Sequence, residues 1–302
     1  MATADPQRLV ASRPTVRAAL ELATSALRKA GVESGRADAE WLLAETLGVG
    51  RGRLGLEGQR TLEPADAERY VRALRRRLAR EPLQHIVGTQ AFRGVVVRVS
   101  AGALVPRPET EALAGWALEL LPPASRDPLA IDVGTGSGCI ACALASERRD
   151  LRVIALDVSP PAAALAADNI AALGLADRVS VRISDLFSAL TVERADLIVA
   201  NPPYLPTAVI PSLAPEVRCH DPRLALDGGS DGLDVIRRLV EAAPRWLAPG
   251  GRLVLETAGG PQARAVVALM SANRFSDVVT RPDLAGIERF VAGGAPPCLP
   301  AC

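Results

Sequence analysis

Apolar residues in the first 80 positions recur at intervals of three and four, which is the spacing of helices that bury one face. A first helix is predicted from Thr15 to Gly31, a second from Ser34 to Gly48 and another over 64–80, with a short helical turn over 51–58. The apolar residues of the first two helices are Val16, Ala19, Leu20, Ala23, Leu27, Trp41, Leu42, Leu43 and Leu47, and in the helix over 64–80 Ala67, Val71, Leu74 and Leu78 are expected to point inward. Residues 1–13 lack such a pattern and are expected to be frayed. Helical segments without a strand predict a small all-α domain over residues 1–84.

The pattern changes after residue 84 to short apolar runs typical of strands. Residues 90–99 predict a hairpin with Arg93 and Gly94 near its turn, so residues 85–105 are interpreted as a linker between two domains. Two prolines hold the next segment extended, and a helix is expected over 109–121.

From residue 128 onward, short buried strands alternate with helical stretches. Strands are predicted over 129–133, 153–157, 179–183, 196–200 and 252–257, with two closing strands over 278–280 and 289–292. Helices lie between most of them, including 161–173 and 232–247. The alternation predicts an α/β fold with a doubly wound, mostly parallel seven-stranded sheet over residues 106–295, followed by a loose tail at 296–302.

Composition and charge narrow the class of protein. Hydrophobic residues make up 49% of the chain and aromatic residues only 3%, which favours helices packed on a sheet over a β-sandwich. The 35 basic and 34 acidic residues give a net charge of +1, so no overall footprint for nucleic acid or membrane exists, although a local patch is possible. The charge-free stretch 133–146 is too short to span a bilayer, and the N-terminus lacks a signal-peptide pattern. A cytoplasmic protein is predicted.

The cysteines and histidines give no sign of a disulfide framework or a metal site. The cysteines are odd in number and irregularly spaced, at Cys139, Cys142, Cys219, Cys298 and Cys302. Cys139 and Cys142 match C-x-x-C but fall in the helix expected after a glycine-rich turn, where small buried thiols are the better interpretation. His85 and His220 are the two histidines, a scarcity that weakens the case for a zinc site, and no metal ligand is predicted.

The helix over 64–80 is rich in arginine. It carries Arg69, Arg72, Arg75, Arg76, Arg77 and Arg80. These side chains can form a solvated face whose stems cover apolar surface, or they can dock onto an acidic protein or RNA phosphates. The sequence leaves both interpretations open.

The strand over 196–200 ends abruptly at Asn201-Pro202-Pro203-Tyr204. Asn-Pro is a turn signal, so Asn201 is placed at the carboxyl end of a buried strand. In open α/β sheets this edge is where ligands bind. The tetrapeptide is therefore a candidate site, against the simpler interpretation of a plain turn.

A glycine-rich turn follows the first strand of the sheet. It consists of Gly134, Thr135, Gly136, Ser137 and Gly138. Cys139 stands where a dinucleotide fingerprint needs its third glycine, and no P-loop lysine follows. With these two kinds of site excluded, the turn indicates a site for a nucleoside-type ligand that has no pyrophosphate.

Two acids complete the predicted ligand site. Asp157 ends the second strand and is placed to accept hydrogen bonds from ribose hydroxyls. Asp185 follows the third strand and can accept a bond from an adenine amine, while Leu186 or Phe187 covers the base. Together with Asn201, these groups occupy the ends of four consecutive strands and are expected to face one cleft.

With these motifs in place, the sequence resembles the S-adenosylmethionine-dependent methyltransferases of the seven-stranded, Rossmann-like class, and more closely the peptide chain release factor glutamine methyltransferase family. The resemblance covers nearly the whole chain. Its segments are 82–88, 105–111, 132–138, 157–160, 201–204, 215–218, 222–229 and 249–251. This chain departs from the family pattern at Thr257-Ala258-Gly259-Gly260 and at Ile287-Glu288, which leaves details of the substrate-side surface open.

The resemblance implies methylation, with S-adenosylmethionine, of the side-chain amide nitrogen of the glutamine in the Gly-Gly-Gln loop of class I peptide chain release factors, in support of translation termination. It also implies that the N-terminal helical domain helps to hold the release factor. In this interpretation Asn201 Oδ1 and the Pro202 carbonyl accept the two amide N–H bonds, Pro203 helps to fix the turn, and Tyr204 lies against the amide plane. Asn201, Gly134 to Gly138, Asp157, Asp185 and Leu186 would contact the cofactor. No membrane and no stable nucleic-acid partner are expected.

Two alternatives remain open from the residues. The same tetrapeptide suits a methyltransferase that acts on the amine of adenine or cytosine in DNA or RNA, which would have to flip the base into the pocket. A non-catalytic adaptor that kept the fold is disfavoured because the glycine turn, both acids and Asn201 are all present.

Overall fold

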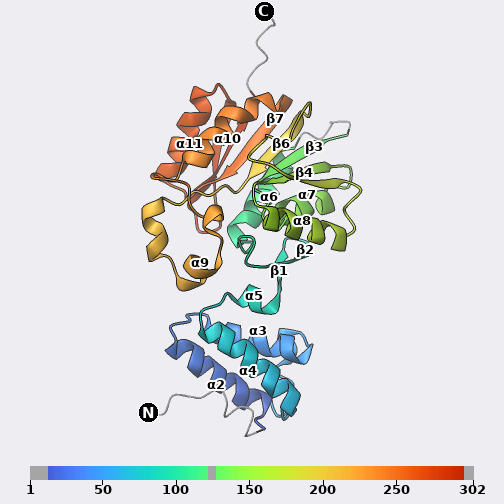
Figure 1. Ribbon diagram of the computed structural model, residues 1–302, viewed down its shortest axis with the longest axis vertical. Coiled ribbons are helices and arrows are strands. Elements are labelled where there is room, and N and C mark those ends of the chain that lie inside the picture. Colours follow the sequence, from blue (N-terminus) through green and yellow to red (C-terminus); the bar gives the residue numbers. More distant parts are fainter. Residues whose placement is uncertain (1–12, 122–126, 296–302) are drawn as a thin grey trace, which may run out of the picture. The chain divides into compact units, whose positions relative to one another are not determined.

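Helices α2 (Val16–Lys29), α3 (Gly35–Leu47) and α4 (Pro64–Leu78) pack their apolar faces against one another in the N-terminal part of the chain (Figure 1). The computed structural model describes residues 13–121 and 127–295. The Thr15 side chain caps α2 by accepting a hydrogen bond from the Ala18 N–H, and glycines with positive φ, Gly31 and Gly48, follow the ends of α2 and α3. The predicted helices are confirmed. The expected frayed residues 1–12 and the tail at 296–302 lie outside the described residues.

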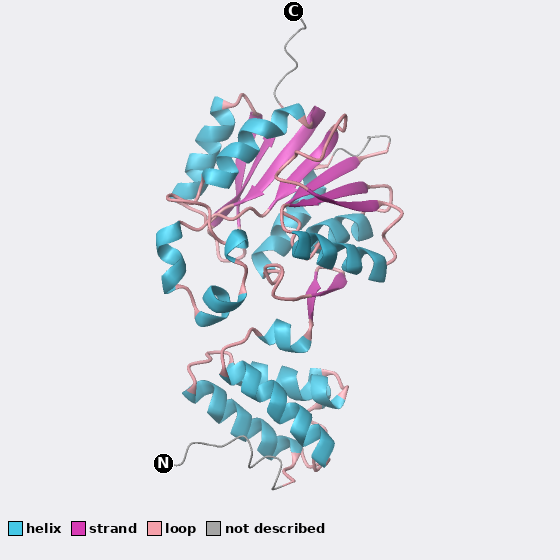
Figure 2. Ribbon diagram, viewed as in Figure 1, coloured by secondary structure: helices cyan, strands magenta, loops and turns pink. Residues whose placement is uncertain are grey.

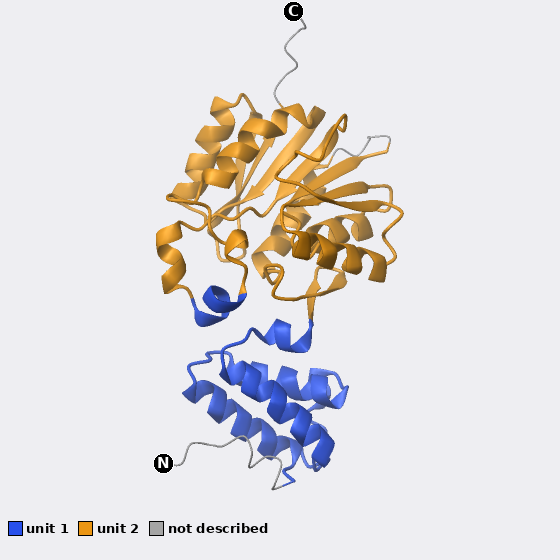
Figure 3. Cartoon of the chain, in the orientation of Figure 1, with its two compact units in different colours: residues 1–88, 214–220 blue, residues 89–213, 221–302 orange. Residues whose placement is uncertain are grey.

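Two short elements complete this region, and a third joins it from far along the sequence. The 3₁₀ turn η1 (Arg51–Arg53) was predicted from the sequence. Helix α5 (Leu83–Val87), between Pro82 and Gly88, was not predicted, because it is too short to show the periodic spacing of apolar residues in a helix. Residues 1–88 and 214–220 form one compact unit, and residues 89–213 and 221–302 form the other (Figure 3). The domain boundaries predicted from the sequence place residues 214–220, with α9 (Pro215–His220), in the α/β domain over 106–295. The structure instead groups this segment with the N-terminal helices.

Strands β1 (Thr89–Phe92) and β2 (Val95–Arg98) form the predicted antiparallel hairpin. Arg93 adopts a positive φ of 49° in its turn. Phe92, Val95 and Val97 point into the core of the second unit, so the hairpin belongs to that unit.

Within the described residues, seven strands form one sheet in the order β5-β4-β3-β6-β7-β9-β8 (Figure 2). The strands are β3 (Leu129–Val133), β4 (Arg152–Asp157), β5 (Val179–Ile183), β6 (Ala195–Ala200), β7 (Leu247–Glu256), β8 (Ser276–Pro282) and β9 (Glu288–Gly294). The first five are parallel, and β9 runs antiparallel between β7 and β8. The chain moves outward from β3 in one direction and then resumes on the other side with β6. The carboxyl ends of β3 and β6 therefore meet at a topological switch point, where such sheets bind ligands.

Helices cover both faces of the sheet. Helices α6 (Pro108–Leu120), α7 (Cys139–Glu147) and α8 (Pro160–Ala172) contribute to one apolar core, and α10 (Asp234–Ala242) and α11 (Pro261–Ala272) to the other. Alternate strand residues enter the two cores, with Ala130 in one and Ile131 in the other, as a doubly wound sheet requires.

The helix predicted over 232–247 is too long. Pro244 lies in a 3₁₀ turn, η4 (Ala243–Arg245), and β7 already begins at Leu247. The connection after β6 contains two further 3₁₀ turns, η2 (Thr207–Ser212) and η3 (Arg223–Ala225). Across residues 13–121 and 127–295, no helix combines the length and apolar character needed to cross a membrane.

Candidate functional site

A cavity of about 360 Å³ opens at the carboxyl edge of the sheet in the second unit. The predicted site residues that line it are Gly134, Thr135, Gly136, Ser137, Asp157, Asp185, Leu186, Asn201, Pro202 and Pro203. Gly138 and Tyr204 are not among its lining residues. The structure thus brings the ends of β3, β4, β5 and β6 to one space, as the motif order indicates.

The glycine-rich turn keeps its backbone close to this space. Gly134, Gly136 and Gly138 have φ values of 74°, 57° and 79°, which side chains with a Cβ seldom adopt. A Cβ at Gly134 would meet no atom within 4 Å, so the backbone there borders open volume. A Cβ at Gly138 would lie 3.1 Å from Ala166 Cβ. Gly138 therefore serves the packing of α8 against the turn.

Asp132 anchors the same turn from beneath. Its Oδ2 accepts hydrogen bonds from Thr135 Oγ1 at 2.6 Å and from the Ala141 N–H at 3.2 Å, which ties the turn to the start of α7. Burial raises the pKa of Asp132 to about 7, with the two hydrogen bonds partly offsetting it. Asp132 is not among the residues that line the cavity.

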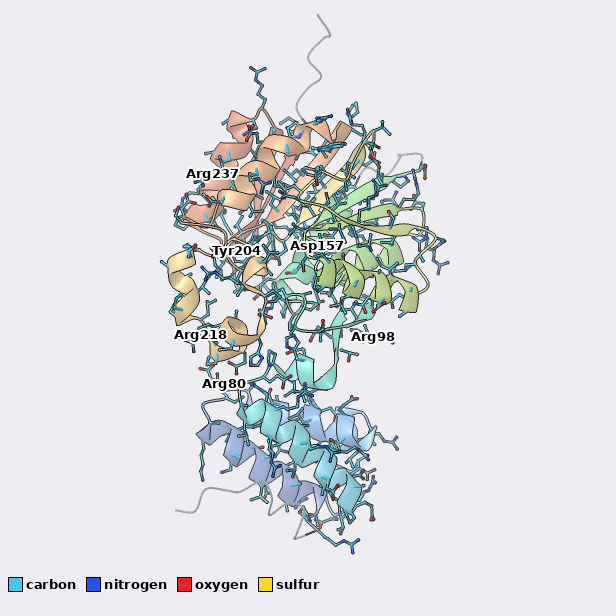
Figure 4. The ribbon with its side chains drawn as sticks, viewed as in Figure 1. Arg80, Arg98, Asp157, Tyr204, Arg218 and Arg237 are labelled. Atoms are coloured by element: carbon cyan, nitrogen blue, oxygen red, sulfur yellow. The ribbon has the colours of Figure 1, made fainter. Side chains whose placement is uncertain are left out.

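Asp157 presents a fixed carboxylate at the end of β4 (Figure 4). Its Oδ2 accepts the Gly136 N–H at 2.8 Å and its Oδ1 accepts the Ser159 N–H at 2.9 Å. Burial raises the pKa of Asp157, and these backbone donors partly offset the shift. Each carboxylate oxygen has a further lone pair, so a ligand that donates hydroxyl protons matches this group.

The loop after β5 supplies an apolar surface and a carboxylate, which pairs with an arginine of α10. Asp185 Oδ2 lies 2.7 Å from Arg238 Nη2, and both residues line the cavity. Leu186 also lines it, whereas Phe187 is buried and stacks on Trp246 at 6.1 Å between ring centroids. Of the two residues considered for covering a base, Leu186 faces the cavity.

Asn201 begins a chain of hydrogen bonds that runs through Thr110, which also lines the cavity, to Glu256 and Tyr204, which do not. Asn201 Nδ2 donates to Thr110 Oγ1 at 2.9 Å, and Thr110 Oγ1 donates to Glu256 Oε2 at 2.8 Å. The Tyr204 hydroxyl lies 3.3 Å from Glu256 Oε1. The donor end of the Asn201 amide is therefore engaged, and Oδ1 is the end available to a ligand.

Glu256 is a buried acid that sequence reasoning did not identify, and Thr110 was quoted only as part of a family segment. Burial raises the pKa of Glu256 to about 7, while the Thr110 hydrogen bond, the Arg289 charge and the Tyr204 hydrogen bond lower it in part. Arg289 itself pairs with Asp283 at 2.9 Å. A signal for Glu256 was available in the sequence, because this acid ends the apolar run of β7. An acidic residue in such a place is seldom buried unless it has partners, so partners were to be expected.

The cysteine pair lies inside α7. Cys139 and Cys142 are buried free thiols, and burial raises both pKa values, that of Cys142 to about 12. Thiols held protonated in this way are poor nucleophiles and poor metal ligands. Among the residues that the structure describes, no group of three or more His, Cys, Asp or Glu side chains is arranged to hold a metal. Cys298 and Cys302 lie outside the described residues.

The arginine-rich helix uses several of its charges within its own unit. Arg77 Nε contacts Asp38 Oδ2 at 2.7 Å in a buried pair, and Arg77 Nη2 contacts Glu216 Oε1 of α9 at 2.8 Å. Arg80 binds the same carboxylate with two nitrogens, at 2.7 and 2.8 Å. Arg69, Arg72 and Arg76 pair with Asp66, Glu68 and Glu81. These contacts give the helix a structural role, which neither sequence interpretation foresaw.

This chain is similar to known proteins in both of its parts. Residues 18–88 match the PrmC N-terminal domain, and residues 117–212 match the methyltransferase small domain. A release factor glutamine methyltransferase from Cereibacter sphaeroides is 45% identical over 92% of this chain and 98% of that protein. A protein of the same name from Geobacter sulfurreducens is 43% identical over 92% and 96%. The solved structure of a methyltransferase from Pyrococcus furiosus, 17% identical, covers 68% of this chain and 92% of that one with a TM-score of 0.50, which is a likeness of fold alone.

Proposed function

This chain belongs to the release factor glutamine methyltransferase family, and from that premise we propose that it methylates the side-chain amide nitrogen of the Gly-Gly-Gln glutamine in class I peptide chain release factors. The observation that carries the proposal is the orientation of Asn201. Its donor end is bound to Thr110 at 2.9 Å, so its acceptor end serves the cavity. A primary amide offers two N–H donors and matches such an acceptor.

The cavity fits S-adenosylmethionine, which supplies an electrophilic methyl group when bound. The open volume beside Gly134 admits a ligand close to the backbone. Asp157 would hold the ribose hydroxyls through the lone pairs that Gly136 and Ser159 do not occupy. Leu186 would cover the base, and Asp185 would accept from its amine while paired with Arg238. Thr135 and Ser137, which also line the cavity, would complete the cofactor side of the site.

The protein's task is to orient a weak nucleophile. An amide nitrogen is a poor nucleophile because its lone pair is delocalised into the carbonyl. Asn201 Oδ1 and the Pro202 carbonyl would accept the two substrate N–H bonds, which hold the nitrogen in place and favour its pyramidal form. These bonds strengthen as the nitrogen becomes positive, so they stabilise the transition state more than the ground state.

The prolines and Tyr204 have different parts in this proposal. Pro202 and Pro203 have no N–H and a fixed φ, so they add no competing donor and hold the carbonyl direction. Contact between the Tyr204 ring and the substrate amide stays a prediction. The Tyr204 hydroxyl is close to Glu256, and Tyr204 is not among the residues that line the cavity.

The test is methyl transfer from labelled S-adenosylmethionine to purified release factors and, in parallel, to duplex DNA and RNA. We expect label on the release factor only, and mass mapping should place one methyl group on the glutamine of the Gly-Gly-Gln loop. A release factor with that glutamine replaced by alanine is the matched control and should remain unlabelled. Label on nucleic acid but not on the release factor would overturn the proposal in favour of an amine methyltransferase.

A further inference from the structure

We propose that Thr110 and Glu256 are positioning residues that fix which end of the Asn201 amide faces the cavity. The inference rests on the proposed function, because it explains how the acceptor for the substrate amide is kept in its working orientation. The proposal assigns a role to a buried acid that is not among the residues lining the cavity.

Three elements bring these side chains together. Asn201 follows β6, Glu256 is the last residue of β7, and Thr110 lies in the first turn of α6. Ala200 pairs with Leu255 in the parallel ladder, so Asn201 and Glu256 are neighbours at the same edge of the sheet. Thr110 bridges them, with 2.9 Å to Asn201 Nδ2 and 2.8 Å to Glu256 Oε2.

The direction of the hydrogen bonds follows from the chemistry of the three groups. An amide has a donor end and an acceptor end, and a hydroxyl can act as donor or as acceptor. Thr110 alone could therefore bind either end of Asn201. An ionised Glu256 only accepts, so it takes the single Thr110 proton. Thr110 then has only lone pairs left for Asn201, and only Nδ2 can face it.

Burial makes this arrangement strict. Thr110 lines the cavity but is only 3% exposed, and Glu256 is 1% exposed, so the hydrogen bond between them is buried. A reversed Asn201 would place its Oδ1 against the Thr110 lone pairs and leave Nδ2 toward the substrate N–H groups. Two acceptors would then face each other at the buried Thr110 hydroxyl, and two donors would face each other in the cavity, which costs more than the loss of one exposed hydrogen bond.

Other groups hold the carboxylate in its place. Glu256 Oε1 accepts a hydrogen bond from the Tyr204 hydroxyl at 3.3 Å, and the positive charge of Arg289 favours the ionised form of the Glu256 carboxyl. Tyr204 therefore serves the amide of Asn201 through Glu256, whether or not its ring reaches the substrate. An oriented Oδ1 also selects an amide over a carboxylate, because a glutamate in the substrate loop would bring oxygen against oxygen.

The experiment compares Thr110→Val with Thr110→Ser, using a release factor as substrate. Valine keeps the shape of threonine without the hydroxyl, and serine keeps the hydroxyl. We expect kcat to fall about tenfold or more in Thr110→Val, with the affinity for S-adenosylmethionine within about threefold of wild type by calorimetry. Thr110→Ser should recover most of the loss. Thermal melting of each variant verifies that the protein remains folded at the assay temperature.

A double-mutant cycle shows whether Thr110 acts through Asn201. On an Asn201→Ala background, Thr110→Val should change kcat by less than about twofold, because the group it positions is gone. The inference is overturned if Thr110→Val turns over like wild type, if Thr110→Ser is as slow as Thr110→Val, or if the two effects are additive. A wild-type enzyme that leaves release factors unmethylated would instead refute the proposed function.

Discussion

At the residue scale, the site is built from polar groups whose partners are settled before a ligand arrives. Asp157 accepts backbone N–H bonds on both oxygens, and Asn201 commits its nitrogen to Thr110. Such fixed groups need little reorganisation when a ligand binds, which is the condition for strong electrostatic stabilisation in a dry site. Asp185 differs, since it is more than half exposed and its partner is Arg238.

Asp157→Ala should weaken the binding of S-adenosylmethionine. The variant loses a buried acceptor that two backbone N–H groups hold in place, so Kd measured by calorimetry should rise about tenfold or more. Asp185→Ala serves as the matched control. Its exposed carboxylate is expected to contribute less, with Kd rising by less than about fivefold. Equal effects of the two substitutions would contradict the ranking.

The protonation of Glu256 should appear in the pH dependence of turnover. Burial raises the pKa of this carboxyl to about 7; Thr110, Arg289 and Tyr204 lower it in part, and Glu109 raises it. These groups face it from α6, β9 and the segment after β6. Below this pKa the protonated Glu256 can donate a hydrogen bond to Thr110 Oγ1. The Thr110 hydroxyl can then donate its own proton to Asn201 Oδ1, which would reverse the Asn201 amide.

The wild-type kcat is therefore expected to fall, by up to about tenfold, as the pH is lowered through about 7. Glu256→Gln cannot titrate, so its kcat should be nearly flat over the same range. Saturating cofactor and release factor in both series separate kcat from binding. Identical pH profiles for the two proteins would show that Glu256 is not the titrating group.

At the element scale, α9 stands out because it is separated in sequence from the helices that it joins. Glu216 accepts hydrogen bonds from Arg77 of α4 and from Arg80, two residues beyond its end. Burial raises the pKa of Glu216, but the arginine hydrogen bonds outweigh it and bring the pKa to about 2. A depressed pKa means that the ionised group stabilises the fold at neutral pH, and this contribution is lost as the pH falls from about 5 toward 2.

Glu216→Gln should destabilise the protein by about 1–3 kcal/mol in urea unfolding at neutral pH, since a charged acceptor shared by two arginines is lost. The loss should shrink as the pH approaches the acid range, where wild-type Glu216 is itself protonated. Glu68→Gln is the control, because its ion pair with Arg72 is long, at 4.0 Å, and exposed. A free energy of unfolding that changes equally in the two variants would contradict this account.

At the scale of the whole molecule, the residues that line the cavity all belong to the second unit, while α2, α3 and α4 form the core of the first. The sequence was sufficient to predict the helical N-terminal domain and the α/β domain, because helical spacing, the alternation of strands with helices, and glycine or proline breaks are local signals. It also placed Gly134, Asp157 and Asn201 correctly at the edge, since Asp157 ends a strand and the other two directly follow one. Their convergence follows from parallel strand order alone.

The features that escaped prediction depend on contacts between distant residues. Thr110 and Glu256 meet across 146 positions, and Arg77 and Glu216 across 139. No local pattern encodes such pairs. Pro215–His220 shows the same limit, since its six residues are too few for a period and its partners lie in α4. Gly138 was placed in the cofactor turn by its spacing, but its close neighbour, Ala166, could be identified only in three dimensions.

The central claim is that Asn201 orients a substrate amide, and that its expected contact with the cofactor contributes little to cofactor affinity. It is tested most directly by the single-turnover rate of Asn201→Ala on a release factor, measured together with its affinity for S-adenosylmethionine. We predict a rate at least about a hundredfold below wild type, with an affinity within a few fold of wild type. A variant that methylates the glutamine at the wild-type rate would contradict the account.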